Sequence, residues 1–469
     1  MNPKWLVPVL SDIRFWILLF FAVRLFGITD PPIETTHSWR QAFTCMVSRN
    51  MVEISANPMY PRTDMPGYNP DIVASEFPAF NFIIFLVARA FGYSHWYGRL
   101  INLLISSLGI YCFYLMVRRY YGERTAFFAG VILLFSVWFT FSRKIMPDTF
   151  SISMVLIGLW FLTRYLDRNR PEYLLFFFLT GTLGGLSKIP ATVILATALI
   201  PLFVSRIRIG QRVLTGTALF LSVAVISAWY FWWEPYLLRT YHNQLYFPRS
   251  VFQGFQELID MGFWTVDKFT FVALQSYVGL ASFILGFYYA IRNRNKLILV
   301  ILVLTGGMFF IYMVKAGNVF SNHTYYIIPF VPVMALLAGY GLASLPRPGF
   351  SFLLLAGIAV EAILNQYHDF LIKESDQYKV NLESIADQVS EREDLVAVNG
   401  GLDPQLIYFL HRKGWSVSDE DLRQPGAVDQ MQQAGCKYLF IIRSSFQDTL
   451  PYSLVYQQGN VQVYRLARH

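Results

Sequence analysis

Ionisable side chains gather in a few short segments that separate long apolar runs of the chain. In order along the sequence, these segments contain Asp30, Glu34, His37, Arg40, Gln41, Arg62, Glu76, Arg143, Asp148, Lys188 and His323. Carboxylates and imidazoles are the usual general bases of enzymes, whereas Arg and Lys side chains hold phosphate groups. Ionisable groups at membrane depth are costly and normally line a cavity or mark a functional site. The pattern therefore indicates acid–base chemistry on a substrate that carries a phosphate.

Three of these residues are candidates for a catalytic base, and each has a plain structural alternative. Asp148 lies at the start of an apolar run, where a carboxylate also serves as a helix N-cap worth about 1 kcal/mol. Glu76 stands in the string Glu76-Phe-Pro78 and would otherwise be a solvated loop carboxylate. His37 would otherwise form structural hydrogen bonds beside Trp39. The sequence alone leaves the base open among these three.

Four cations are candidates for binding the phosphate of the donor: Arg40, Arg62, Arg143 and Lys188. A guanidinium group clamps phosphate through two N–H groups, and a Lys ammonium supplies a point charge. Their alternative role is to anchor the protein at the lipid headgroups, where long basic side chains extend towards water. The residues expected to contact the rest of the substrate are Gln41, Trp39, His323 and Tyr326. For the tyrosine, an interfacial aromatic belt explains the position nearly as well.

The apolar runs that separate these segments are long enough to be membrane-spanning helices. Hydrophobic residues make up 55% of the chain and charged residues only 14%, whereas a soluble domain carries about a quarter charged residues. Spanning the hydrocarbon layer takes about 20 apolar residues. Eleven spans are predicted, near residues 13–28, 96–117, 125–141, 148–164, 172–185, 191–204, 214–233, 267–291, 297–314, 325–343 and 350–366. The expected fold is an all-α polytopic membrane protein.

Lys and Arg residues are distributed unevenly between the two sides of these spans. Fifteen lie on the short loops of one side, against Arg143, Lys144, Lys188 and Lys315 on the other. Because cytoplasmic loops are enriched in basic residues, the N-terminus is predicted to be cytoplasmic and the protein integral to the cytoplasmic (inner) membrane. The apolar segment 79–92 is interpreted as interfacial or re-entrant, because one more crossing would reverse this bias. The net charge of +8 thus reflects topology and indicates no nucleic-acid partner.

Three longer segments are predicted on the outer side: Thr29–His95, Glu234–Val266 and Gln366–His469. The last one changes in character, because its charge density rises and strand patterns at 395–399, 438–442 and 461–466 accompany a helical pattern at 404–412. The domain prediction is a transmembrane module at 1–366, with a long first outer loop at 29–95, and a small soluble α/β extracytoplasmic domain at 367–469.

The ordered polar strings resemble the GT-C glycosyltransferases, in particular bacterial relatives of protein mannosyltransferases and of the lipid A aminoarabinose transferase. The resemblance covers about residues 13–345 and rests on His37-Ser-Trp-Arg-Gln41, Tyr60-Pro-Arg62, Glu76-Phe-Pro78, Arg143 to Asp148, Lys188-Ile-Pro190 and His323-Thr-Tyr-Tyr326. It implies a GT-C helical bundle and transfer of a sugar from a polyprenyl-phosphate donor to a glycan, lipid or protein acceptor. It also implies that transfer takes place on the extracytoplasmic side, with inversion at the anomeric carbon.

The sequence departs from that family in the first outer loop. The family usually has an Asp-Glu pair there, whose Asp serves as base or binds a metal, and here Arg40 and Gln41 stand at that pair. Phe43 stands where the resembled branch often has an Asp. Since these acids are missing, no cofactor is expected and a divalent metal is not favoured. The three cysteines form no metal-type spacing, and one disulfide is conceivable.

Two other functions fit part of the pattern. A transporter or lipid flippase would also be polytopic and basic inside, but transporters tend to show repeats and polar residues at the bilayer midplane. Here the polar residues are expected to converge at the extracytoplasmic end of the bundle. A polysaccharide polymerase or ligase would share the topology and the donor, and only acceptor assays would separate it. The glycosyltransferase is the preferred interpretation, with its sugar, its lipid carrier and its acceptor left open.

Overall fold

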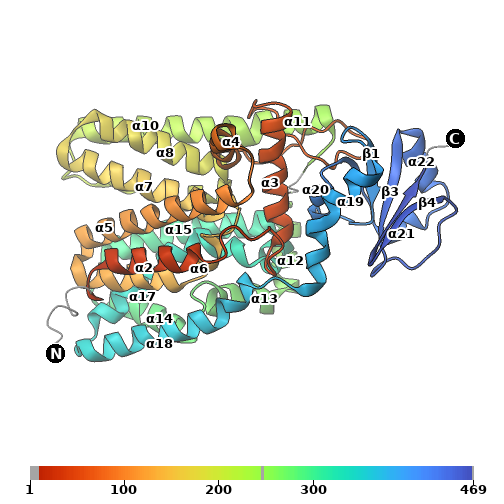
Figure 1. Cartoon of the computed structure of the whole chain (residues 1–469). Coiled ribbons are helices and arrows are strands. Elements are labelled where there is room, and N and C mark those ends of the chain that lie inside the picture. Colours follow the sequence, from red (N-terminus) through yellow and green to blue (C-terminus); the bar gives the residue numbers. More distant parts are fainter. Residues whose placement is uncertain (1–9, 245–247, 467–469) are drawn as a thin grey trace. The chain divides into compact units, whose positions relative to one another are not determined.

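A computed structural model of the chain describes residues 10–244 and 248–466. These residues form two compact units, each made of three segments of the chain. Unit 1 contains the described residues of Met1–Ile28, Arg99–Trp232 and Phe247–His368, and unit 2 contains those of Thr29–Gly98, Trp233–Tyr246 and Asp369–His469. Unit 1 is helical, whereas unit 2 combines helices with a sheet (Figure 1).

Unit 1 is a bundle of helices around one apolar core of buried aliphatic and aromatic side chains. Its α-helices are α2 (Ile13–Leu25), α5 (Trp96–Phe135), α6 (Trp138–Phe141), α7 (Pro147–Arg168), α8 (Pro171–Ser187), α9 (Thr192–Leu195), α10 (Ile209–Ala228), α12 (Val251–Asp260), α13 (Gly262–Asp267), α14 (Tyr277–Arg292), α15 (Lys296–Ala316), α16 (Asn318–Asn322), α17 (Val331–Ser344) and α18 (Pro348–Gln366). Its 3-10 and π-helical segments are η1 (Ile189–Ala191), η2 (Ala196–Phe203), η3 (Trp229–Trp233), η4 (Lys268–Val272), η5 (Thr324–Phe330) and η6 (Tyr367–Phe370).

The helix lengths agree with a chain that crosses a membrane several times. Among the described residues, six helices are long and apolar enough to span, or seven if α13 and η4 count with α14 as one broken span. The chain is thus a multi-pass integral membrane protein, while the number of eleven spans stays a prediction. The six include α5 as a single helix, although its 40 residues would extend about 60 Å. Gly122 interrupts α5 with φ 82° and ψ 171°, between the predicted spans 96–117 and 125–141.

The predicted span 267–291 is bent instead of straight. The segment Gly262–Val272 meets α14 at an angle of 85°. The Ser276 hydroxyl accepts a hydrogen bond from the Gly279 N–H, and the Glu361 carboxylate accepts one from the Tyr277 N–H at 3.0 Å. Because these side chains satisfy N–H groups that a helix start leaves without partners, the bend is a stable feature of the fold.

The α7–α8 hairpin places residues 148 and 188 at the same end of the bundle. Proline occupies the first turn of each helix, where its missing N–H carries no penalty. Close contact between the two helices depends on Gly184, because an added Cβ would lie 2.6 Å from the Ser151 carbonyl oxygen. Small residues at helix contacts allow this approach in membrane proteins. The end of α8 therefore lies against the first turn of α7.

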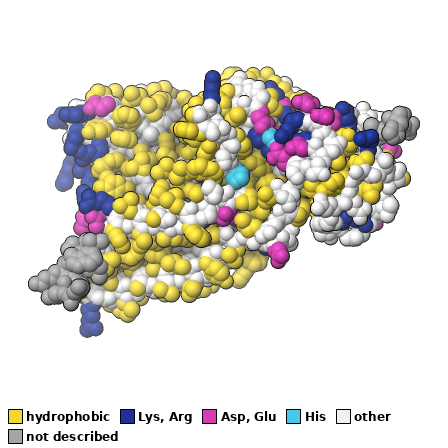
Figure 2. Space-filling view, viewed as in Figure 1, with side chains coloured by type: hydrophobic (Ala, Val, Ile, Leu, Met, Phe, Trp, Pro, Cys, Tyr) yellow, Lys and Arg dark blue, Asp and Glu magenta, His cyan; other side chains and the backbone are white. Residues whose placement is uncertain are grey.

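Basic side chains gather at the opposite end of the hairpin. Figure 2 shows Lys and Arg side chains in dark blue at the end of the bundle that holds the α7–α8 turn, and hydrophobic side chains along its flank. Arg168 and Arg170 lie in this turn. This is the end that the sequence assigns to the cytoplasm.

Unit 2 contains helices from the first outer loop and a five-stranded sheet. Its helices are α3 (Ser38–Glu53), α4 (Ala79–Phe91), α11 (Glu234–Tyr241), η7 (Glu374–Asn381), α19 (Leu382–Val389), α20 (Gln405–Leu410), α21 (Asp419–Leu422) and α22 (Ala427–Gln433). Its strands are β1 (Leu395–Val398), β2 (Lys413–Ser416), β3 (Cys436–Ile442), β4 (Ser453–Gln458) and β5 (Val461–Arg465), in the order β2-β1-β3-β5-β4. The first three are parallel to one another, and β5 and β4 are antiparallel to their neighbours.

The predicted strands at 395–399, 438–442 and 461–466 correspond to β1, β3 and β5, whereas β2 and β4 were not predicted. β2 is only four residues long and contains Gly414, where an added Cβ would lie 1.9 Å from the Val396 carbonyl oxygen. Glycine is depleted in β-strands, so a short strand that requires a glycine for close contact is hard to recognise from its sequence. β4 is an edge strand with mostly exposed side chains, so it lacks the alternation that marks a half-buried strand.

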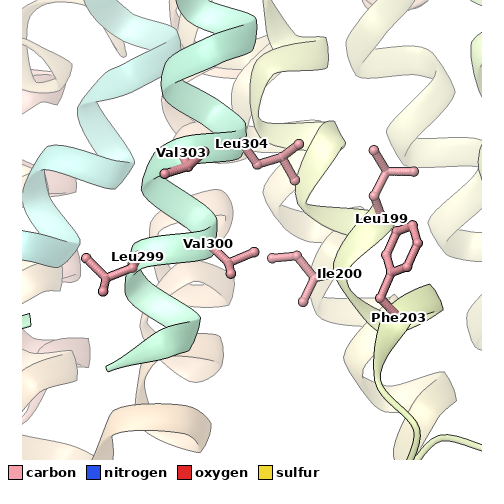
Figure 3. A pocket seen from close by; sticks show the side chains of 7 residues that line it. All are labelled: Leu199, Ile200, Phe203, Leu299, Val300, Val303 and Leu304. Atoms are coloured by element: carbon pink, nitrogen blue, oxygen red, sulfur yellow. The ribbon is translucent and has the colours of Figure 1, made fainter. Parts of the chain in front are cut away.

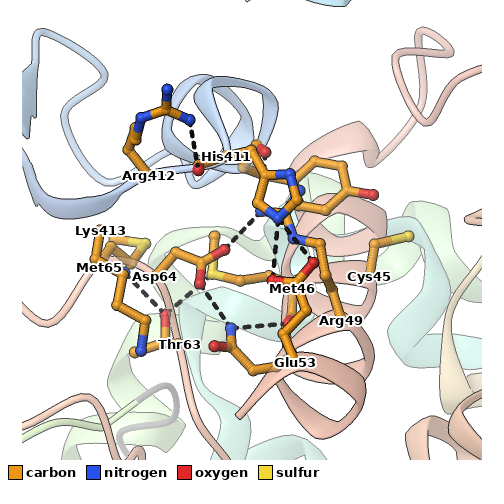
Figure 4. Close-up of polar contacts among 12 residues, drawn as sticks. Cys45, Met46, Arg49, Glu53, Thr63, Asp64, Met65, His411, Arg412 and Lys413 are labelled. Atoms are coloured by element: carbon orange, nitrogen blue, oxygen red, sulfur yellow. Dashed lines mark hydrogen bonds and ion pairs between the residues drawn. The ribbon is translucent and has the colours of Figure 1, made fainter. Parts of the chain in front are cut away.

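Arg49 joins α3 of the first loop to α20 of the C-terminal segment within unit 2. Its Nη2 donates to Asp64 Oδ2 at 2.8 Å and to the Tyr408 carbonyl at 3.0 Å, and its Cζ lies 4.4 Å from the centre of the Tyr408 ring. Asn50 Nδ2 donates to the other Asp64 oxygen at 2.6 Å. Arg49 and Asp64 are both buried, and Figure 4 shows this contact. The first loop and the C-terminal segment thus fold as one body.

His411 forms a second link between the same segments. The imidazole Nδ1 lies 2.7 Å from Glu383 Oε1 on α19, and Nε2 lies 2.9 Å from Glu53 Oε1 on α3. Burial by itself would lower the pKa of His411, but the hydrogen bonds to Glu383 and Glu53 outweigh it and raise the pKa above the usual 6.5. The hydrogen bond from His411 lowers the pKa of Glu383 to about 2.

We expect this link to make unit 2 sensitive to alkaline pH. The raised pKa of His411 contributes stability that is fully present below pH 6.5 and is lost as the pH rises through the folded-state value. The lowered pKa of Glu383 contributes stability that is present above pH 4.5 and is lost as the pH falls towards about 2. The effect of His411 is measured as the midpoint temperature of thermal unfolding of unit 2 between pH 5 and 9. This temperature should fall as the pH rises. His411→Gln should flatten this decline, and an equal decline in that variant would contradict the assignment.

Candidate functional site

Asp148 and Lys188 form an ion pair in unit 1. The Lys188 ammonium lies 2.8 Å from Asp148 Oδ1, and both side chains are largely buried. Asp148 Oδ2 is buried as well, and it has no hydrogen-bond partner among the described residues. The predicted N-cap role of Asp148 is wrong, because Met146 occupies the N-cap and Asp148 lies in the first helical turn of α7. The pair therefore offers one carboxylate oxygen as an acceptor beside a cation.

A buried network holds the turn that leads to Asp148. Asn102 of α5 is completely buried, and its Nδ2 donates to the carbonyls of Phe141 and Lys144 at 2.9 and 2.8 Å. The Thr149 hydroxyl donates to Asn102 Oδ1 at 3.0 Å. Because each partner is satisfied inside the bundle, the first turn of α7 has a fixed position.

His323 and two tyrosines lie next to the ion pair. The Lys188 ammonium is 5.0 Å from the centre of the Tyr325 ring, and the centres of the His323 and Tyr325 rings are 5.4 Å apart. The Tyr326 ring lies 5.7 Å from His323. His323 Nδ1 lies 3.0 Å from the Val319 carbonyl oxygen, which orients the imidazole. Within unit 1, the structure thus brings Asp148, Lys188, His323 and Tyr326 of the predicted residues together.

Arg143 holds the end of α2. Its Nη1 donates to the Phe26 carbonyl at 2.7 Å and its Nη2 donates to the Gly27 carbonyl at 3.0 Å. Arg24, which the sequence analysis did not single out, is buried on α2, and it donates to the Phe20 carbonyl at 2.9 Å and to the Ser142 hydroxyl. Cations at a helix C-terminus interact favourably with its free carbonyls. These contacts give Arg143 a structural role, and its predicted role in phosphate binding stays a prediction.

Unit 2 gathers a second set of the predicted residues around α3. Arg40 and Glu76 form an ion pair, and the Arg40 Cζ lies 5.5 Å from the centre of the Phe43 ring. Gln41 is completely buried and Trp39 is half-buried. His37 is the N-cap of α3, with a left-handed backbone at φ 54°. In this unit the Glu76 carboxylate is therefore held by the Arg40 guanidinium, at a position where the sequence comparison predicted an acid in the resembled family.

Two carboxylates of the first loop, Asp71 and Glu34, have structural surroundings in unit 2. Arg62 pairs with Asp71, which also pairs with Lys413 of β2. These contacts join the first loop to the sheet and give Arg62 a structural role, so its phosphate-binding role stays a prediction. Glu34 had no assigned role in the sequence, yet its side chain is completely buried. A carboxylate two positions after a pair of prolines, Pro31 and Pro32, was the available signal for it.

The expectation about metals remains a prediction. Among residues 10–244 and 248–466, no group of three or more His, Cys, Asp or Glu side chains is arranged to hold a metal ion. Cys45, Cys112 and Cys436 are buried free thiols, so the conceivable disulfide is absent from the described chain.

Apolar hollows in unit 1 lie apart from the charged residues. One of about 440 Å³ lies between η2 and α15 and is lined by Leu199, Ile200, Phe203, Leu299, Val300, Val303 and Leu304 (Figure 3). A second, of about 450 Å³, lies among α5, α7, η2, α15 and α17 and shares Ile200 with the first. Neither lining contains a charged side chain. These hollows fit an apolar chain, and their linings carry no charge that would attract a sugar phosphate.

Known proteins share this architecture. The crystal structure of ArnT from Cupriavidus metallidurans in the apo state matches with a TM-score of 0.60 at 17% identity, over 96% of this chain and 97% of ArnT. The chain has the GT-C fold. ArnT bound to undecaprenyl phosphate matches the GT-C fold of this chain with a TM-score of 0.60 at 16% identity, over 96% of this chain and 98% of that one.

Two more comparisons agree with the GT-C fold. The oligosaccharyltransferase AglB from Archaeoglobus fulgidus, in complex with an inhibitory peptide and a dolichol-phosphate, matches with a TM-score of 0.57 at 10% identity, over 92% of this chain and 70% of that one. Residues 74–232, about a third of the chain, match the family model of dolichyl-phosphate-mannose-protein mannosyltransferases. No curated protein matches the chain in sequence. None of these similarities supports the transporter alternative.

Proposed function

We propose that the chain is a glycosyltransferase that moves a sugar from a polyprenyl-phosphate donor to an acceptor hydroxyl on the extracytoplasmic side of the membrane. The observation that carries this proposal is the buried Asp148–Lys188 pair beside Tyr325 and His323 in a GT-C fold. ArnT and AglB, which share the fold, have structures that hold undecaprenyl phosphate and dolichol-phosphate. Those complexes support a polyprenyl-phosphate donor for this chain too.

In the proposed step, the acceptor oxygen attacks the anomeric carbon of the donor sugar from the side opposite the phosphate. The new bond is carbon to acceptor oxygen, and the bond between the anomeric carbon and the phosphate oxygen breaks with its electron pair on that oxygen. Asp148 takes the acceptor proton on Oδ2, the oxygen without a partner among the described residues. Lys188 interacts with the phosphate and stabilises its growing negative charge. This displacement inverts the anomeric centre.

The apolar hollows suit the tail of such a donor. Both are lined by aliphatic and aromatic side chains, and the hollow in Figure 3 lies beside residues that are exposed on the flank of unit 1, such as Phe203 and Val303. An isoprenoid chain that enters from the bilayer would bury apolar surface at about 25 cal/mol per Å². In this proposal the tail lies between η2 and α15, while the sugar phosphate lies at the end of the bundle that holds Asp148 and Lys188.

A donor panel tests the proposal directly. Purified protein, reconstituted with a membrane lipid extract as acceptor source, is incubated with polyprenyl-phosphate sugars, and the released polyprenyl phosphate is measured with and without EDTA. We expect release from at least one donor, at a rate that EDTA leaves unchanged. Absence of both turnover and binding across the panel would overturn the proposed function, and a loss of rate in EDTA would overturn the expected metal independence.

A further inference from the structure

Lys268 is a buried lysine in unit 1 that the sequence did not single out. It is the first residue of the π-helical segment η4, and its side chain is only 3% exposed. The Ala273 N–H donates to the Lys268 carbonyl at 2.9 Å, across five residues. π-Helical turns of this kind are often found at functional sites. Lys268 and Val272 are the two buried residues of the segment, so both face the interior of the bundle.

The Lys268 ammonium has no hydrogen bond or ion pair with any residue in the part of the chain that the structure describes, whereas Lys188 is neutralised by Asp148. Its neighbour Asp267 interacts with it electrostatically, but the two side chains form no ion pair. A lysine near a bilayer commonly extends its ammonium to water, and although Lys268 is only 3% exposed, its ammonium nitrogen keeps some contact with solvent. A buried cation without a counter-charge is costly, and a bound anion would relieve this cost.

Lys268 belongs to the same region as the proposed donor site. The η4 segment packs against η5, and the ring of Phe269 lies 6.2 Å from that of Phe330. Lys188, Lys268 and Asp148 all interact electrostatically with the His323 imidazole. With two lysines and one carboxylate, this group of side chains carries an excess of one positive charge when the imidazole is neutral.

We propose that Lys268 is a second cation that binds the phosphate of the polyprenyl donor. It acts together with Lys188, while Asp148 serves as the base. This inference rests on the proposed function. The donor phosphate is a diester with one negative charge, and the product is a monoester that carries about −1.5 to −2 at pH 7. Negative charge therefore grows on the phosphate during transfer, and Lys268 stabilises this charge together with Lys188. The ammonium should bind the product more strongly than the donor.

Lys268→Met and Lys268→Arg test this role, with Lys296→Met, an exposed lysine at the start of α15, as the matched control. We expect Lys268→Met to bind polyprenyl phosphate at least ~10-fold more weakly than the wild type, because a hydrogen bond to a charged group is lost. The donor should lose less affinity than the product, and kcat should fall as well. Lys268→Arg should retain most of the affinity, and Lys296→Met should bind like the wild type.

A double variant decides whether both lysines act on one phosphate. If they do, the losses of affinity in Lys188→Met and Lys268→Met should not add in the combined variant. Wild-type affinity for polyprenyl phosphate in a folded Lys268→Met protein, judged by its thermal unfolding, would overturn the inference and leave the proposed function standing. Additive losses would also overturn it, because they indicate separate sites. Failure of the wild type itself to bind polyprenyl phosphate would overturn the proposed function instead.

Discussion

Asp148→Asn should lower the rate of sugar transfer by about 10²–10⁴-fold while binding of polyprenyl phosphate persists. The carboxamide keeps the shape of the side chain but does not accept the acceptor proton. Asp148 is a better candidate for the base than Glu76, because its Oδ2 has no partner among the described residues and Glu76 is engaged by Arg40. The measurement is kcat for release of polyprenyl phosphate from the donor that the panel identifies.

Two controls separate the chemistry from the ion pair. Removing the Asp148 charge leaves Lys188 buried without its partner, which by itself destabilises the fold by several kcal/mol. The combined variant Asp148→Asn with Lys188→Gln removes both charges, so it should regain stability and stay inactive. Asp260→Asn, at an exposed position on α12, should keep wild-type activity. Full activity in Asp148→Asn would remove this residue from the mechanism, and Glu76→Gln and His37→Gln would then test the remaining bases.

Arg49→Met should destabilise unit 2 by about 3–5 kcal/mol, since it leaves the buried Asp64 carboxylate without its cation. It also removes the contact with the Tyr408 ring and carbonyl. Hydrogen exchange of the α20 peptides measures this effect, because local opening sets their exchange rates. A loss of about 3–5 kcal/mol corresponds to exchange that is faster by about 10²–10⁴-fold.

Arg392→Met is the matched control for Arg49→Met. Arg392 pairs with Glu383 at 3.0 Å, and both side chains are 44% exposed. Exposed ion pairs contribute about 0–1 kcal/mol, so exchange in α20 should change little in this variant. Equal protection of α20 in Arg49→Met and in the wild type would show that the Arg49–Asp64 pair does not hold the C-terminal segment to the first loop.

Much of the secondary structure follows from patterns that are local in the sequence. The predicted spans 148–164 and 297–314 correspond to α7 and α15, because a run of about 20 apolar residues satisfies its backbone only as a helix within a bilayer. The apolar run Leu395–Val398, which contains two β-branched valines, likewise predicted β1. Local patterns did not predict the bend before α14, because it depends on Glu361 of α18, which accepts hydrogen bonds from the first N–H groups of α14.

By itself, the sequence determined that the chain crosses a membrane several times, that a small sheet ends it, and which ionisable residues were candidates for chemistry. Hydropathy and residue type act over a few neighbouring positions, so they are readable from one chain. Only the tertiary structure decided the pairings. Asp148 meets Lys188 forty positions away because Gly184 lets two helices touch, and Lys268 is buried because η4 packs against η5. Such contacts depend on how distant segments pack, and a local pattern carries no information about that.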